Sequence, residues 1–68
     1  MPQYSADRII KALLKHGFQL VRSKGSHQIF KNQEGFMVPV PFHGKKKSIP
    51  LGTALAIIRQ SGIAREEF

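Results

Sequence analysis

The sequence predicts a small α+β domain, a two-layer α-β-β-β-α sandwich. Apolar residues recur at helical spacing near both ends of the 68-residue chain, and its middle contains three short strand-like runs separated by turns. Short connections make consecutive strands antiparallel, so we expect a three-stranded meander. The apolar stripes of both helices must be buried, which places both helices on one face of that sheet. A chain of this length forms one domain, residues 1–68, with a thin core.

Two helices are predicted from their capping residues and apolar stripes. The first begins after Ser5, a good N-cap residue, and ends at Gly17. Its stripe comprises Ala6, Ile9, Ile10, Leu13 and Leu14. The second begins with Pro50, which fits the first helical turn, and ends at Gly62. Its stripe comprises Leu51, Ala54, Leu55, Ile57 and Ile58.

Three strands are predicted between the helices. They cover residues 18–24, 27–31 and 36–42. The break between the first two falls at Gly25, and Pro39 places the third at a sheet edge because proline donates no ladder hydrogen bond. Ile29 and Phe30 are adjacent and both apolar, which leaves open the inward face of the second strand and the face that carries His27.

The two ends of the chain are expected to have structural roles. Residues 63–68 predict one more helical turn, with Phe68 as its anchor. Glu66 and Glu67 are neighbours there and are interpreted as solvated charges. Tyr4, the only tyrosine, is expected to pad the start of the first helix rather than to stack on a base.

The charge balance favours a polyanionic partner. Eleven Lys and Arg residues against four Asp and Glu residues give a formal net charge of +7, which suits a phosphate backbone or an acidic protein. The chain has no cysteine, so disulfides and thiolate zinc sites are excluded. No apolar run approaches the ~20 residues that a membrane span needs, and no signal-peptide pattern opens the chain. These features predict a soluble, cytoplasmic protein.

The inventory of side chains excludes most catalytic chemistry. The four carboxylates lie at a helix start, in a turn and in the tail, so no pair is placed to act as general acid and base or to hold Mg²⁺. The three histidines are widely spaced, and their spacing gives no sign of a metal site. We therefore expect no cofactor, and any enzyme built on this chain works without a metal ion.

Gly25, Ser26 and His27 form the candidate catalytic motif, at the bend between the first two strands. A histidine there can exchange protons with a phosphodiester near neutral pH, while nearby cations stabilise negative charge in the transition state. The basic residues close in sequence are Arg22, Lys24 and Lys31. Spacing alone leaves an ordinary polar turn residue as the more frequent explanation of such a histidine.

The other basic features have both functional and structural interpretations. His43 follows the third strand and is either a second proton carrier or a loop-capping residue. A lysine run follows, which fits contact with RNA phosphates, although such runs are more often solvated loops. The run comprises Lys45, Lys46 and Lys47. His16 precedes the glycine that ends the first helix, where an imidazolium complements the helix dipole, so a structural role is expected.

Several segments together form a recognisable pattern: residues 20–27, 29–30, 38–43, 51–55, 58, 62–63 and 67–68. The Gly-Ser-His tripeptide is common by itself, but its place between the first two strands of this element order makes the pattern specific. On these segments, from Tyr4 to Phe68, the sequence resembles the HicA family of mRNA interferase toxins. Ala64 departs from the family, in which a serine or threonine helix cap is common at this point.

The resemblance implies a fold like that of double-stranded RNA-binding domains and a toxin that cleaves mRNA, arresting translation and growth. It implies His27 as the catalytic residue, with Gly25 and Ser26 as its motif neighbours. It also implies a HicB-type antitoxin that covers the active site. Two alternatives remain: a non-catalytic RNA-binding module of the same fold, and an interaction domain whose basic face binds an acidic protein.

Overall fold

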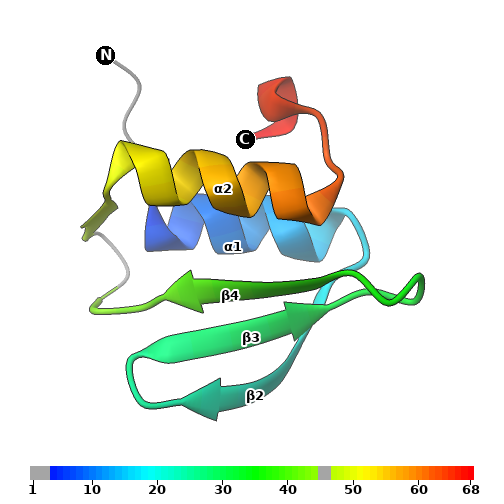
Figure 1. The fold of residues 1–68 in the computed structure, drawn as a ribbon, viewed down its shortest axis with the longest axis horizontal. Coiled ribbons are helices and arrows are strands. Elements are labelled where there is room, and N and C mark those ends of the chain that lie inside the picture. Colours follow the sequence, from blue (N-terminus) through cyan, green and yellow to red (C-terminus); the bar gives the residue numbers. More distant parts are fainter. Residues whose placement is uncertain (1–3, 45–46) are drawn as a thin grey trace.

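The computed structural model describes residues 4–44 and 47–68 and has the predicted α+β architecture. Its elements are β1 (Tyr4–Ser5), α1 (Ala6–Lys15), β2 (Gln19–Lys24), β3 (His27–Lys31), β4 (Met37–Pro41), β5 (Ser48–Ile49), α2 (Leu51–Ser61) and the 3-10 turn η1 (Arg65–Glu67). Strands β2, β3 and β4 form an antiparallel meander in chain order, so β4 is an edge strand as its proline predicts. Both helices lie on the same side of this sheet (Figure 1).

Helix α1 begins where the cap residues predict. The backbone N–H of Arg8 donates to Ser5 Oγ at 3.4 Å, and the Ser5 hydroxyl donates to Asp7 Oδ1 at 2.5 Å. Ile9 and Leu13 are fully buried, but Leu14 is 53% exposed, so its place in the predicted apolar stripe is wrong. The helix packs mainly against β1 and β4, and these contacts bury a narrower arc of its surface than the predicted stripe covers.

The core lies between the two helices and strand β4. Val38 and Val40 of β4 are fully buried, and Phe30 of β3 is 2% exposed. The register pairs Phe30 with Val38, so these side chains share the face of the sheet that the helices cover. Helix α2 adds Ala54, Ile57 and Ile58 to this core.

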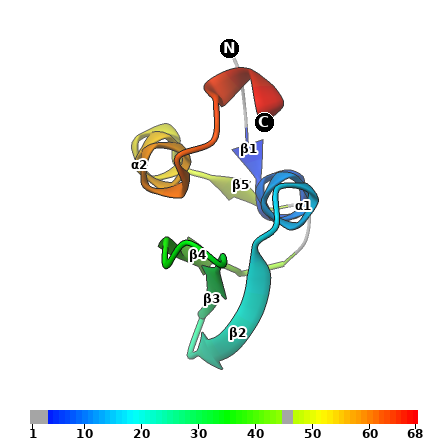
Figure 2. The ribbon, with the colours of Figure 1, turned by 90° about the vertical axis from the view of Figure 1, so that its right-hand side faces the viewer.

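Strand β2 differs from the other two because all six of its residues are exposed. Leu20 pairs with the buried Phe30 yet is 48% exposed. Figure 2 shows that β2 is the strand farthest from α2, with β4 the nearest of the three. The prediction that the helices cover one face of the sheet therefore holds for β4 and part of β3. A two-helix layer in so short a chain does not reach the third strand.

A second, two-stranded sheet pairs the segments that precede the two helices and was not predicted. β1 pairs with β5 in antiparallel register, Tyr4 opposite Ile49, and both are 5% exposed. Strands of two residues carry no alternation pattern that a sequence can show. The Arg8 guanidinium lies 5.4 Å from the centre of the Tyr4 ring, so the expected structural role of Tyr4 is confirmed.

The C-terminal turn is anchored as predicted. Phe68 is buried, and its carbonyl oxygen accepts a hydrogen bond from Arg8 Nε at 2.8 Å. Ala64 gives η1 no side-chain cap, so the contacts of Phe68 are what attach the turn to α1. Glu67 Oε1 lies 3.2 Å from His16 Nε2 at the end of α1. Glu67 is therefore part of the tail's attachment, which corrects its interpretation as a purely solvated charge.

Candidate functional site

The Gly25-Ser26 bend is a two-residue hairpin turn that joins β2 directly to β3. Gly25 has a φ of 58°, whereas Ser26 is not among the residues of positive φ. This combination matches a type II′ turn, which takes glycine at its first central position. The turn puts Lys24 directly opposite His27 in the ladder, with their Cβ atoms about 5 Å apart. A tight turn therefore brings an imidazole and an ammonium group together.

His27 lies on the open face of the sheet, the face turned away from the helices. Its strand neighbours Gln28 and Phe30 pair with the buried Val40 and Val38, so they belong to the covered face. His27, Ile29 and Lys31 alternate with them and point the other way. The His27 side chain is exposed and has no hydrogen bond within residues 4–44 and 47–68, so its ring is accessible to a ligand.

Three predicted RNA-binding residues share this open face. Arg22 pairs with Ile29, Lys24 pairs with His27, and Lys31 lies on β3 itself. All three are exposed, and in the part of the chain that the structure describes none forms an ion pair with a carboxylate. These cations are spread along the β2–β3 pair, an arrangement that suits contacts to successive phosphates of a nucleic acid strand.

The remaining predicted basic residues lie in the loop after β4. Lys47 is exposed, and its carbonyl oxygen accepts a hydrogen bond from Ala6 N at 3.2 Å. Lys45 and Lys46 lie outside the described residues. Of the lysine run, only Lys47 has a described position, and its backbone is attached to the start of α1 by this hydrogen bond.

His43 lies at the same end of the sheet as His27. The N–H of Phe42 donates to the Ser26 carbonyl oxygen at 2.6 Å, which extends the β3–β4 pairing as far as the hairpin bend. His43 is the next residue and is exposed. It lines a hollow of about 270 Å³ together with Lys47, Ser48 and Thr53. His27 begins β3 and His43 follows β4, so both histidines lie at the same end of the sheet, although His27 does not line this hollow.

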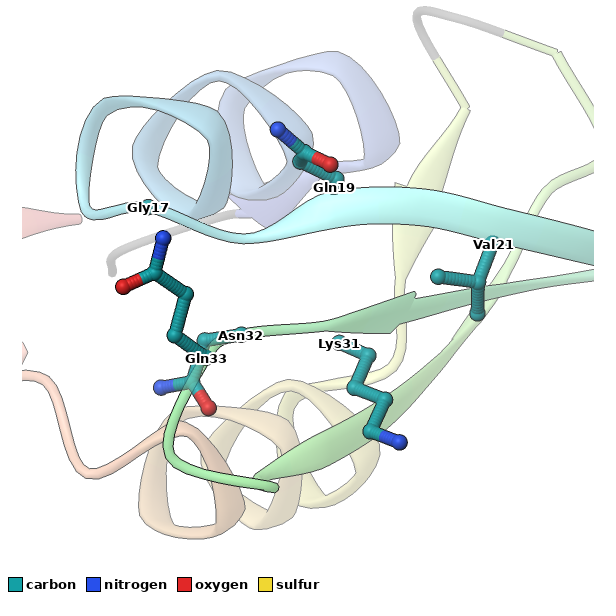
Figure 3. A pocket seen from close by; sticks show the side chains of 6 residues that line it. All are labelled: Gly17, Gln19, Val21, Lys31, Asn32 and Gln33. Carbon is teal, nitrogen blue, oxygen red and sulfur yellow. The ribbon is translucent and has the colours of Figure 1, made fainter.

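A second feature of the open face lies at the opposite end of β3 and was missed by the sequence analysis. It is a shallow hollow of about 210 Å³, which we call the β2–β3 hollow (Figure 3). Its lining residues are Gly17, Gln19, Val21, Lys31, Asn32 and Gln33. Val21 belongs to it because the β2–β3 register shifts between Leu20 and Arg22 and leaves Val21 without a partner. A bulge of this kind has no signature in the sequence.

Among the described residues, no three His, Asp or Glu side chains are grouped closely enough to hold a metal ion. Asp7 is engaged with Ser5, and this hydrogen bond lowers the pKa of the Asp7 carboxyl. Within the same residues, neither helix is long and apolar enough to cross a bilayer.

Comparison with known proteins identifies the family. The family model of the HicA toxin of bacterial toxin–antitoxin systems matches residues 6–63, which includes both helices, the whole meander and the hairpin bend. The chain belongs to the HicA toxin family. A search of the curated proteins finds no significant match. As a HicA toxin, the chain has the role of a toxin, and membership implies an antitoxin partner.

Proposed function

We propose that this HicA toxin is an endoribonuclease that cleaves mRNA without a metal ion, with His27 as its catalytic residue. The observation that supports this most directly is the position of the imidazole, which is exposed on the open face opposite Lys24. RNA phosphates would contact Arg22, Lys24 and Lys31, together with the lysine run over residues 45–47. Cleaved messages would stop translation and growth.

The proposed reaction is transesterification within the RNA strand. The ribose 2′-oxygen attacks its neighbouring phosphorus while the P–O5′ bond breaks, which gives a 2′,3′-cyclic phosphate and a 5′-hydroxyl. His27 accepts the proton of the 2′-hydroxyl, and the leaving 5′-oxygen takes a proton from a second group. Lys24 stabilises the negative charge that develops on the phosphoryl oxygens. DNA lacks the 2′-hydroxyl and would resist.

One histidine does not readily supply both proton transfers in a single step. Ser26, a lysine or water remain alternatives for the second group, but the position of His43 favours it. The hydrogen bond from Phe42 N–H to the Ser26 carbonyl oxygen holds the residue before His43 against the hairpin bend. We therefore include His43 in the proposal as the second proton carrier.

The antitoxin partner is proposed to be of the HicB type and to cover the open face. Exposed cations without partners make this face complementary to an acidic surface. Covering His27 would then block the RNA substrate and silence the toxin.

The test compares the three histidines of the chain on one unstructured RNA. We expect His27→Ala to slow cleavage by about 10²–10⁴-fold, the usual contribution of a positioned general acid or base. His43→Ala should reduce kcat and remove one limb of the pH profile. His16→Ala is the matched control, because His16 lies at the end of α1 beside Glu67, and it should cleave at the wild-type rate.

Each variant is first checked for folding by circular dichroism, and the ends of the fragments are analysed. Cleavage should continue in EDTA and leave 2′,3′-cyclic phosphates. RNA binding without any cleavage by the wild type would favour the rival function, a non-catalytic RNA-binding module. Full activity of His27→Ala, or fragments with 5′-phosphate ends, would contradict the proposed chemistry.

A further inference from the structure

We propose that the β2–β3 hollow binds one unpaired base of the RNA, about two nucleotides from the bond that is cleaved. This inference rests on the proposed function, since it assumes that His27 marks the cleaved bond. The hollow would recognise a base and so contribute to sequence specificity, whereas the cations of the open face contact only phosphates.

The lining of the hollow suits a base. Figure 3 shows the Gln33 side chain extending toward Gly17, the Gln19 side chain on the neighbouring strand, and Val21 between β2 and β3. Neither amide forms a hydrogen bond within residues 4–44 and 47–68. Each amide offers a donor and an acceptor side by side, which is the pattern that the polar edges of bases match. The methyl groups of Val21 provide apolar contact for the ring.

The loop that carries Gln33 is held in place. Asn32 Oδ1 accepts hydrogen bonds from Glu34 N at 3.0 Å and from Phe36 N at 2.9 Å. These two bonds fix the turn around Gln33 before any ligand arrives. A preorganised turn loses little conformational entropy on binding, so the Gln33 amide can discriminate between ligands.

Charge around the hollow sets the direction of the strand. Lys31, the last residue of β3, lines the hollow on one side. An adjoining hollow that shares Gly17, Gln19 and Gln33 is lined by Glu34 and His16, and Glu34 is the only carboxylate in either lining. A phosphate is attracted to the ammonium group and repelled by the carboxylate. The RNA backbone would therefore stay on the Lys31 side and turn a base inward.

The distance to the catalytic end gives the position of the base. Lys31 follows His27 by four residues on β3, so the two lie about 13 Å apart at a rise of about 3.3 Å per residue. A nucleotide repeats six backbone bonds where an amino acid repeats three, so an extended nucleotide spans about 7 Å. Single-stranded RNA therefore covers the distance in about two nucleotides.

The experiment moves one abasic ribonucleotide along an RNA whose cleavage site has been mapped with the wild-type toxin. We expect kcat/KM to fall about tenfold when the missing base is the second one from the cleaved bond on one side, and to change less at the other positions. Gln33→Ala should lower kcat/KM on the intact RNA to a similar extent. The same variant should no longer respond to the abasic substitution, because the two changes remove one interaction.

Gln60→Ala is the matched control, since Gln60 is an exposed glutamine on α2. It should cleave like the wild type and keep the full response to the abasic site. Equal rates at every abasic position, or an undiminished response in Gln33→Ala, would overturn the base subsite while leaving the proposed nuclease intact. Absence of RNA cleavage by the wild type would instead remove the proposed function.

Discussion

The two edge strands of the meander have opposite surroundings. In β4, Val38 and Val40 are completely buried beneath the helices. In β2, at the other edge, Val21 is 51% exposed and no residue is buried. The two strands flank the same central strand and have nearly the same length, so their surroundings follow from the position of the helices.

The difference means that the residues that stabilise the fold and the residues of the candidate site lie in different parts of one small sheet. The apolar contacts that fold the 68-residue chain come from β4 and from Phe30 of β3, whereas β2 is held by its backbone ladder with β3 and by the glycine turn. The candidate catalytic and RNA-binding side chains lie mainly on that hairpin. Because this surface is exposed to solvent, it can carry cations without carboxylate partners, whereas burying such charges in a core would cost free energy.

Matched valine substitutions test this separation most strongly. Val40→Ala should cost about 2–3 kcal/mol, because it deletes buried methyl groups and leaves a cavity. Val21→Ala removes the same atoms from the opposite edge and should cost less than about 1 kcal/mol, mainly through lower strand propensity. Urea unfolding followed by circular dichroism measures both. Similar losses for the two variants would mean that β2 is buried in solution.

The next largest effect is expected for RNA affinity when the open face loses its charge. The test uses the triple variant Arg22→Gln, Lys24→Gln and Lys31→Gln, made in the His27→Ala background so that the RNA is not cleaved. The slope of log K for single-stranded RNA binding against log salt concentration should become shallower by about 2. The variant's unfolding free energy should change by less than about 0.5 kcal/mol, since all three side chains are exposed.

A second triple variant controls for total charge. It replaces three exposed basic residues of the two helices, Lys11, Lys15 and Arg59, by glutamine. The variant therefore loses the same charge as the first one, but from the helical side of the molecule. This variant should keep most of the salt dependence. If both triple variants bind RNA alike, the protein attracts RNA through its net charge, and the open face is not a defined RNA site.

The fold was largely predictable because its main signals are local. The Ser5 cap, the Gly17 and Gly62 stops and the Pro39 edge position each act within a few residues and reappear in the structure. The exposure of Leu14 was not predictable in this way, because it depends on how much of the sheet the helices reach. Periodicity identifies an apolar stripe but does not measure its width in the folded chain.

The candidate site was predictable only in part. The hairpin bend and its histidine follow from the sequence, but the face that carries His27 did not, because Ile29 and Phe30 are both apolar. Pairing with β4 decides it, since Phe30 lies opposite the buried Val38. The β2–β3 hollow depends on a bulge at Val21 and on a loop residue from another part of the chain. Such non-local features have no counterpart in spacing or composition.

The smallest change in unfolding free energy is expected at the N-cap of α1, which lies among the helices. The Ser5 hydroxyl donates to Asp7, and this bond is the main reason that the pKa of the Asp7 carboxyl is lowered. A carboxyl whose pKa is lower in the folded state stabilises the fold above its unfolded pKa. That contribution is lost as the pH falls through the folded pKa.

Ser5→Ala should therefore cost about 0.5–1 kcal/mol near neutral pH, the usual contribution of an N-cap residue. The difference from the wild type should narrow in acid, because a protonated Asp7 no longer gains from the hydroxyl. Urea unfolding at about pH 7 and about pH 2.5 measures both values. RNA cleavage at neutral pH should stay at the wild-type rate, because the cap lies on α1 and the candidate site on the hairpin. A cap variant that slowed cleavage while remaining folded would show that the two sides of the sheet are coupled.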